Sequence, residues 1–461
     1  TSIVFIFLAD DGYAFMVAWE SMALSSFFLV ASEHRHAEIR RAAYLYLIIA
    51  HMGALAILLC FGVLAGSAGD YTFDAMRSFP TLGIWPTIAF LLAVFGFGAK
   101  AGLLPLHIWL PEAHPAAPSP VSAMMSGVML KTAIYGLLRV SFDLLSMQHW
   151  GWGALLLVLG LTTALFGVIF STVQNDMKRL LAYSSIENIG LIFIGVGLTL
   201  VFKSFLLLNL AALTLTATLY HCLNHAFFKS LLFLATGSVL HATGERNLGK
   251  LGGLIHHMPW VTWVALVGVL ASAGIPPLNG FVSEWLLLQS FLFTAALPHG
   301  YLNMLLPVGA GAIALIAALA GFAMVKFFGV VFLGQPREER LTQAHDANRL
   351  ERAGLLWLAT GCVLLGLLPN VIIALLDPIT RMLVGSGLRY VSSNYGWWLL
   401  APISEDRASY SAVIFFVGIT LFMACVYWLV RRYYHGRAQR VDAWDCGFPL
   451  QTSRMQDTAE G

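Results

Sequence analysis

The sequence predicts an all-α, polytopic membrane protein with about 11–12 transmembrane helices, and two observations lead to this prediction. Of its 461 residues, 59% are hydrophobic and only 11% are charged, whereas soluble domains carry about 25% charged residues. Apolar stretches of about 20 residues, enough to cross a bilayer core of roughly 30 Å, recur along nearly the whole chain. A transmembrane barrel would show alternating segments of about 10 residues instead.

The individual spans follow from these apolar stretches, and residues 1–9 are expected to be the tail of a further one. The expected spans are 12–31, 42–64, 84–104, 118–140, 152–173, 183–202, 205–240, 259–291, 303–333, 353–377 and 410–430. Residues 378–408 are expected to be interfacial or extramembrane. Because Thr1 already lies in an apolar run, without a basic leader or cleavage site, we expect earlier helices to precede it.

Basic residues indicate which loops share a side of the membrane. If the loop at 35–41 is cytoplasmic, every second loop after it should also be basic. The loops at 178–179, 246–250, 337–352 and 431–440 fit this alternation. The sequence therefore predicts a cytoplasmic C-terminus.

The cysteines and the net charge exclude several functions. The five cysteines lie far apart and form no CxxC pair: Cys60, Cys222, Cys362, Cys425 and Cys446. A four-thiolate iron–sulfur or zinc site is therefore not expected, and we predict no cofactor in this chain. A net charge of +2 gives no reason to expect nucleic acid as a partner, whereas the lipid bilayer is an expected one.

Two segments that resemble each other indicate an internal repeat. Residues 101–106 and 273–278, which are 172 positions apart, are both rich in glycine and proline, and Glu112 and Glu284 follow them at equal distances. The pairs Glu20/Glu187 and His51/His221 recur at nearly the same offset. Five spans per half would place the halves in opposite orientations, so we predict two inverted five-helix repeats with broken helices at 101–106 and 273–278.

This repeat divides the chain into three expected parts. Residues 1–173 would hold the end of the N-terminal helices and the first repeat, 174–333 the second repeat, and 334–461 the C-terminal helices and a cytoplasmic tail. Prolines at the two breaks free backbone carbonyls, which survive at membrane depth only in protein or beside a hydrated cavity. A hydrated path is therefore predicted at both breaks, with a simple proline kink as the alternative.

Titratable residues inside apolar spans are the candidate functional residues, because an intramembrane charge is costly and needs a polar interior. Glu20 and Lys100 are the first candidate pair. A buried carboxylate and amine can exist as ions or exchange a proton, which lysine can do and arginine cannot. The alternative is a static bridge between helices.

A second group of candidates lies at 221–229. His221, His225 and Lys229 have i, i+4 and i+8 spacing, which aligns three proton-exchanging groups over about 12 Å of one helix face. A metal or haem site and ordinary packing are the alternatives. Lys131 lies too deep in its span to reach the interface easily, and Glu284 follows the second break.

Five further residues are secondary candidates: His51, His107, His114, Glu187 and Lys326. Lys326 lies near a span end and could reach the interface instead. His107 and His114 flank the first proline-rich segment, where they could gate a path or simply cap the chain.

Three motifs resemble antiporter-like subunits of respiratory complex I, Mrp antiporters and membrane-bound hydrogenases. They are FGAKAGLLPLHIWLPEAH at 97–114, KRLLAYSS at 178–185 and HAFFKSLLF at 225–233. The resemblance extends from about residue 12 to 333. The tail, with WDCGF at 444–448 and SRMQ at 453–456, resembles the ending of the large membrane subunit of formate hydrogenlyase and hydrogenase-four complexes.

The resemblance implies roles for the candidate residues in proton translocation. Glu20 matches the buried glutamate of the family's fifth helix, Lys100 the lysine of the broken seventh and Lys131 that of the eighth. The series His221, His225 and Lys229 matches the eleventh helix. Glu284 lies on the broken twelfth, where relatives carry lysine or glutamate.

The implied function is a proton-translocating subunit of a group 4 [NiFe]-hydrogenase complex in a prokaryotic cytoplasmic (inner) membrane. Its implied partners are the hydrogenase large and small subunits, iron–sulfur subunits and another membrane anchor subunit, which would hold the NiFe centre and the iron–sulfur clusters. The chain would have no redox centre of its own. A complex I or Mrp Na⁺/H⁺ antiporter subunit, an independent transporter and a non-conducting scaffold remain alternatives, and so does Na⁺ as the ion.

Overall fold

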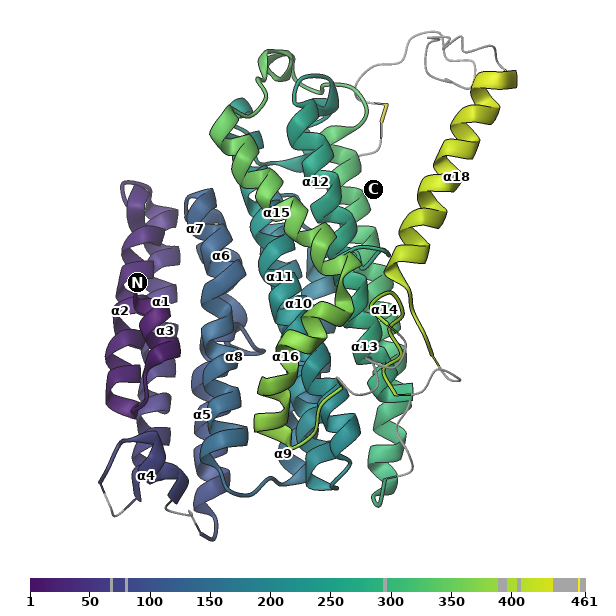
Figure 1. The fold of residues 1–461 in the computed structure, drawn as a ribbon. Helices are drawn as coiled ribbons and strands as arrows, with labels where there is room; N and C mark the ends of the chain where they lie inside the picture. The colour runs from purple at the N-terminus through teal and green to yellow at the C-terminus, as the bar shows by residue number, and fades with distance from the viewer. Residues whose placement is uncertain are drawn as a thin grey trace.

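The computed structural model describes residues 1–66, 69–78, 82–292, 297–388, 396–403, 408–433 and 455–456. In these ranges the chain is all-α, with three isolated β-bridges and no longer strand. Ten of the described helical segments are long and apolar enough to cross a membrane. The predicted fold class is therefore confirmed, and Figure 1 shows the helices standing side by side.

The helices up to Thr172 include one broken span and one span with two π-helical turns. They are α1 (Ser2–Leu8), α2 (Gly12–Val30), α3 (Ala37–Ala65), α4 (Phe73–Ser78), α5 (Trp85–Ala101), α6 (Leu110–Ala116), α7 (Ser119–Met124), α8 (Leu130–Leu138) and α9 (Trp150–Thr172). The π-helical turns, η4 (Met125–Met129) and η5 (Arg139–Leu144), flank α8.

The later helices repeat the pattern of long spans with one broken member. They are α10 (Met177–Ser204), α11 (Leu208–Thr243), α12 (Pro259–Ser272), α13 (Asn279–Leu292), α14 (Gly300–Phe332), α15 (Arg349–Leu367), α16 (Pro369–Val384) and α18 (Ala412–Tyr433). In Figure 1, α18 stands apart from the other helices, and apart from its first residue its described side chains are at least partly exposed.

Both predicted helix breaks are present. α5 ends at Ala101 and is capped by Gly102, which has φ +85° and where an added Cβ would lie 2.8 Å from Leu110 Cδ1; helix resumes at Leu106. α12 ends before Gly274, which has φ +63°, and α13 begins at Asn279. Glycine adopts a positive φ without steric penalty, and the prolines that follow cannot continue the hydrogen-bond ladder.

Residues 82–292 are described without a gap, and in this range four spans separate the two broken ones. Counting from the first broken span, the second is therefore five crossings further along the chain. An odd number of crossings reverses the direction of the chain, as an inverted repeat requires. The expected boundary between the halves at 173/174 falls in the turn between α9 and α10, and this division stays a prediction.

The centre of the bundle is α10, whose apolar span is entirely buried. It packs backbone to backbone against α9 through glycines that admit no Cβ, Gly160 and Gly167 on α9 and Gly190 on α10. Small residues permit such close approach of helices in membranes. This contact positions the polar residues that α10 presents to its other neighbours.

Replacing Gly190 with leucine is therefore expected to prevent folding, because the new side chain would collide with the backbone of Ala164 on α9. Overpacking a tight core costs about 1–3 kcal/mol, occasionally more, so we expect at least severalfold less protein in the membrane fraction. Gly311→Leu on α14 is the matched control, since no atom lies within 4 Å of its added Cβ. Equal amounts of both variants on immunoblots, with equal thermal stability in detergent, would contradict this packing.

The expectation that residues 378–408 are interfacial or extramembrane stays a prediction, although residues 378–384 form the end of a helix. α16 begins at Pro369 directly after α15 and continues to Val384. Its outer side carries an exposed apolar stripe, Val371, Leu375, Ile379 and Met382. Pro378 and the charged residues Asp377 and Arg381, which form a 2.7 Å ion pair, interrupt the apolar sequence but do not end the helix.

Candidate functional site

Lys100 lies in the last turn of α5, just before the first break, and is only 2% exposed. Its ammonium donates a 2.6 Å hydrogen bond to the Tyr46 hydroxyl and lies 6.0 Å from the ring centroid of Trp19. The break leaves carbonyls of α5 without helical partners, and the Trp109 indole donates to one of them, that of Ala99, at 2.9 Å.

The expected pairing of Glu20 with Lys100 is not present. The Glu20 carboxylate lies 3.7 Å from His51 Nε2, and these side chains are 33% and 48% exposed. Successive helix residues point about 100° apart. Trp19 therefore faces Lys100, whereas Glu20 turns to the outer surface of α2 and α3. Glu20 and His51 were expected in the interior of the bundle, but neither lies there.

Lys131 lies on α8 directly after the π-helical turn η4. Its ammonium donates to the Ser126 carbonyl at 2.7 Å and contacts His225 Nδ1. A π-helical turn shifts the backbone register and often occurs at functional sites. Lys131 thus joins the first half of the bundle to α11 of the second half.

Serines form a second link between the halves, which the sequence analysis missed. The Ser126 and Ser185 hydroxyls are 2.8 Å apart. On the same turn of α10, Ser184 accepts a 2.6 Å hydrogen bond from Lys229 and donates a 3.1 Å hydrogen bond to Glu187. The Ser184 hydroxyl therefore lies between a buried amine and a buried carboxylate.

Two histidines of α11, His221 and His225, stand one turn apart, with ring centroids separated by 6.4 Å. His221 contacts Asn188 of α10 at 3.1 Å and the Ser283 hydroxyl of α13 at 3.0 Å. Asn224 donates to Ser283 at 2.9 Å and to the Asn279 carbonyl at 2.7 Å. These contacts tie α11 to the second break.

Glu284 also lies at that break. A Cβ added to Gly274 would lie 2.8 Å from Oε2 of Glu284, so the Glu284 carboxylate sits against the loop that joins α12 to α13.

The secondary candidates occupy different places. His114 is fully buried and stacks on Phe233 with centroids 5.0 Å apart, and neither ring nitrogen has a hydrogen-bond partner among the described residues. His107 packs edge-on against Phe166. Lys326 donates to the Thr172 carbonyl at the end of α9, away from the central residues.

Lys178 differs from the expectation that it is a loop residue. It lies in the first turn of α10, is 2% exposed and donates a 2.6 Å hydrogen bond to the Ala117 carbonyl. Its neighbour Arg179 is exposed and pairs with Glu112. The signal for Lys178 was available in the KRLLAYSS motif that it begins, although the sequence analysis also counted it as a loop charge.

We call the connected residues of α8, α10 and α11, with the side chains that contact them, the polar axis. It comprises Ser126, Lys131, Ser184, Ser185, Glu187, Asn188, His221, His225, Lys229 and Ser283. Lys100 is separated from the polar axis. It donates to the Tyr46 hydroxyl, and that hydroxyl approaches the thioether sulfur of Met129, at 3.9 Å, and not a residue of the axis. The polar axis therefore contains five of the twelve predicted residues, Lys131, Glu187, His221, His225 and Lys229. The other seven lie outside the axis as defined: Glu20, His51, Lys100, His107, His114, Glu284 and Lys326.

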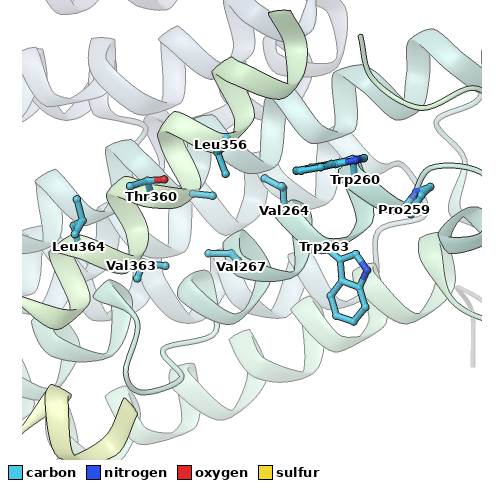
Figure 2. Close-up of a pocket in the computed structure, with 10 residues that line it drawn as sticks. Pro259, Trp260, Trp263, Val264, Val267, Leu356, Thr360, Val363 and Leu364 are labelled. Atoms are coloured by element: carbon cyan, nitrogen blue, oxygen red, sulfur yellow. The ribbon is translucent and has the colours of Figure 1, made fainter. Parts of the chain in front are cut away.

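An apolar groove of about 500 Å³ lies elsewhere, between α12 and α15 (Figure 2). Figure 2 shows Trp260, Val264 and Val267 of α12 facing Leu356, Val363 and Leu364 of α15. Its described lining includes no titratable side chain.

Within the described ranges, no group of three or more histidine, cysteine, aspartate or glutamate residues is placed to hold a metal ion. Four of the cysteines there are free thiols, and Cys446 lies outside the described residues.

A membrane bundle with two broken helices beside buried lysines and histidines defines an antiporter-like membrane subunit. Residues 9–306 match the family model for the transmembrane region of NADH:quinone oxidoreductase and Mrp antiporter subunits. The chain belongs to this family.

Known relatives add detail. The chain is 37% identical over 454 residues to hydrogenase-4 component B of Escherichia coli K12, covering 97% of this chain and 66% of that protein. It is 37% identical to formate hydrogenlyase subunit 3 of the same organism, covering 78% of this chain and 58% of that one. The chain thus spans less than two thirds of the length of either relative.

A solved structure shares the fold. A chain of the membrane-bound sulfane sulfur reductase, an archaeal respiratory membrane complex, superposes with a TM-score of 0.81 at 26% identity, covering 100% of this chain and 72% of that one.

Proposed function

We propose that this chain is the proton-translocating membrane subunit of a group 4 [NiFe]-hydrogenase complex of the formate hydrogenlyase or hydrogenase-4 type. The observation that supports this most is the polar axis, in which amines, imidazoles, hydroxyls and one carboxylate follow one another inside a membrane bundle. Such residues are costly in a bilayer and occur where ions or protons move. The similarity to hydrogenase-4 component B favours this type of complex.

The axis suggests how a proton is passed. Lys131 and His225 are in direct contact, so one can give a proton to the other. Lys229 and Glu187 both hydrogen-bond the Ser184 hydroxyl, which can accept from the amine and donate to the carboxylate. Glu284 at the second break is proposed as the end of the series.

Electron transfer would take place in partner subunits. We propose that these are the hydrogenase large and small subunits, iron–sulfur subunits and a further membrane anchor, which hold the NiFe centre and the clusters. A charge displacement near Lys100 would start each cycle. We further propose a prokaryotic inner-membrane location with the C-terminus in the cytoplasm.

Lys100→Met is expected to abolish proton translocation by the assembled complex, because it removes the amine at which the proposed charge displacement starts each cycle. The measurement is electron-transfer-driven pH change in sealed membrane vesicles. Unchanged translocation at a normal rate of electron transfer would remove Lys100 from the cycle.

A subunit of complex I or of an Mrp antiporter is the second candidate, because the family model covers both. Co-purification followed by a metal and subunit inventory discriminates them: nickel and hydrogenase subunits favour our proposal. A non-conducting scaffold would predict that changes at Lys131 or His225 leave ion movement intact. An independent transporter would show flux from the isolated chain in liposomes.

A further inference from the structure

The apolar groove between α12 and α15 has a basic mouth. The two helices begin at the same end of the groove, where the Arg352 guanidinium of α15 lies 5.4 Å from the ring centroid of Trp260 of α12. Arg349 and Arg352 precede the groove residue Leu356 by seven and four positions, so all three lie on one face of α15. The groove therefore opens beside two arginines.

The acidic groups near this mouth are already engaged. Asp346 accepts hydrogen bonds of 2.9 and 3.3 Å from two backbone N–H groups in the first turn of α12, and it lies 3.7 Å from Arg352. Glu351 contacts Asn348 in the capping box that begins α15. Arg349 is exposed, and its side chain makes no hydrogen bond or ion pair with another described residue. An unpaired positive charge thus remains at the mouth.

The groove is about as deep as one leaflet of a bilayer. Along α15 it extends from Leu356 to Leu364, which is about 12 Å at 1.5 Å per residue, whereas half of a hydrocarbon core is about 15 Å (Figure 2). Trp260 and Trp263 are exposed on α12 close to the mouth. Tryptophans are enriched where headgroups meet acyl chains. The apolar lining therefore matches the depth of acyl chains, and the arginines match the depth of headgroups.

We propose that the groove binds one phospholipid with an anionic headgroup. Its acyl chain lies between α12 and α15, and its phosphate pairs with Arg349 and Arg352. Guanidinium groups bind phosphate oxygens in charge-assisted hydrogen bonds, and basic pockets between transmembrane helices bind anionic headgroups. The lipid would fill the space beside α12, the helix that leads to the second break. This binding site is separate from the polar axis and does not depend on the proposed proton translocation.

The test uses the whole purified complex in phosphatidylcholine vesicles that contain a trace of a photoactivatable lipid. Two probes with the same diazirine-bearing acyl chain are compared, one a phosphatidylglycerol and the other a phosphatidylcholine, and labelled peptides are identified by mass spectrometry. As a share of the total labelling of the chain, we expect the anionic probe to label residues 259–267 and 356–364 at least about fivefold more than the neutral probe. One arginine near an anionic membrane surface is worth roughly that factor in binding.

The other outcomes are distinct. Equal labelling of the groove by both probes would overturn the recognition of an anionic headgroup. Labelling of the groove by neither probe would overturn the lipid site altogether, since a protein segment of the complex would then cover it.

A variant tests the role of the unpaired charge. Arg349→Gln is expected to lower groove labelling by the anionic probe about fivefold and to leave labelling by the neutral probe unchanged. Arg179→Gln is the matched control and is expected to keep the preference, because Arg179 is likewise in the first turn of a helix but pairs with Glu112 and does not line the groove. A full preference for the anionic probe in Arg349→Gln would overturn the role of that arginine. The comparison of the two probes on the unaltered complex remains decisive if a variant does not assemble.

Discussion

Lys131→Met is expected to lower proton translocation by the assembled complex at least about tenfold, because a positioned proton-transfer group typically contributes ~10²–10⁴-fold to a rate. Methionine has a similar length but no exchangeable proton, so the packing around α8 is kept while the contact with His225 is lost. Because Lys131 contacts His225 directly, its replacement removes the contact through which a proton is proposed to enter α11. The measurement is the pH change of sealed vesicles at a fixed rate of electron transfer.

Lys203→Met is the control for this change. Lys203 also lies on a central helix, but at its far end, where it donates to the Leu383 carbonyl at 2.8 Å outside the polar axis. We expect the control to translocate protons normally. If both variants behave alike, whether active or inactive, Lys131 has no special part in the path.

Ser184→Ala is expected to produce the second large loss, again about tenfold or more. The hydroxyl is the atom that Lys229 and Glu187 share, and alanine removes it with little change in volume. Both partners would remain buried without their common hydrogen-bond partner, which also leaves two polar groups unsatisfied. Assembly is checked separately by co-purification of the complex.

Ser184→Thr separates a chemical role from a structural one, because it keeps the hydroxyl and adds a methyl group. Rescue of proton movement by threonine supports transfer through the hydroxyl. A Ser184→Ala variant that assembles and translocates protons at the normal rate would show that Lys229 and Glu187 exchange protons without it.

The fold could be predicted well from the sequence, because bilayer thickness sets span length and because glycine and proline mark breaks locally. The breaks after Ala101 and Ser272 are examples, since their signals lie within a few residues of the structural feature. The α15–α16 junction was missed because the expected span 353–377 runs across Pro369, whereas the structure ends α15 at Leu367 and begins α16 at Pro369.

The candidate site could be predicted only in part, because hydropathy gives depth along a helix but not the direction in which a side chain points. Glu20 was expected to meet Lys100, but Trp19 occupies that direction. Ser184 carries no charge, so composition did not distinguish it from other serines, and only its place in the KRLLAYSS motif drew attention to it. Its importance depends on the packing of α10 against α11, which only the three-dimensional arrangement reveals.

The most direct measurement is the pH change that the unaltered whole complex produces in tightly sealed vesicles during electron transfer. If the buried amines, imidazoles and hydroxyls form a working proton path, the pH changes in step with electron transfer and the change collapses when a protonophore is added. Electron transfer at its full rate with no protonophore-sensitive pH change would contradict that path.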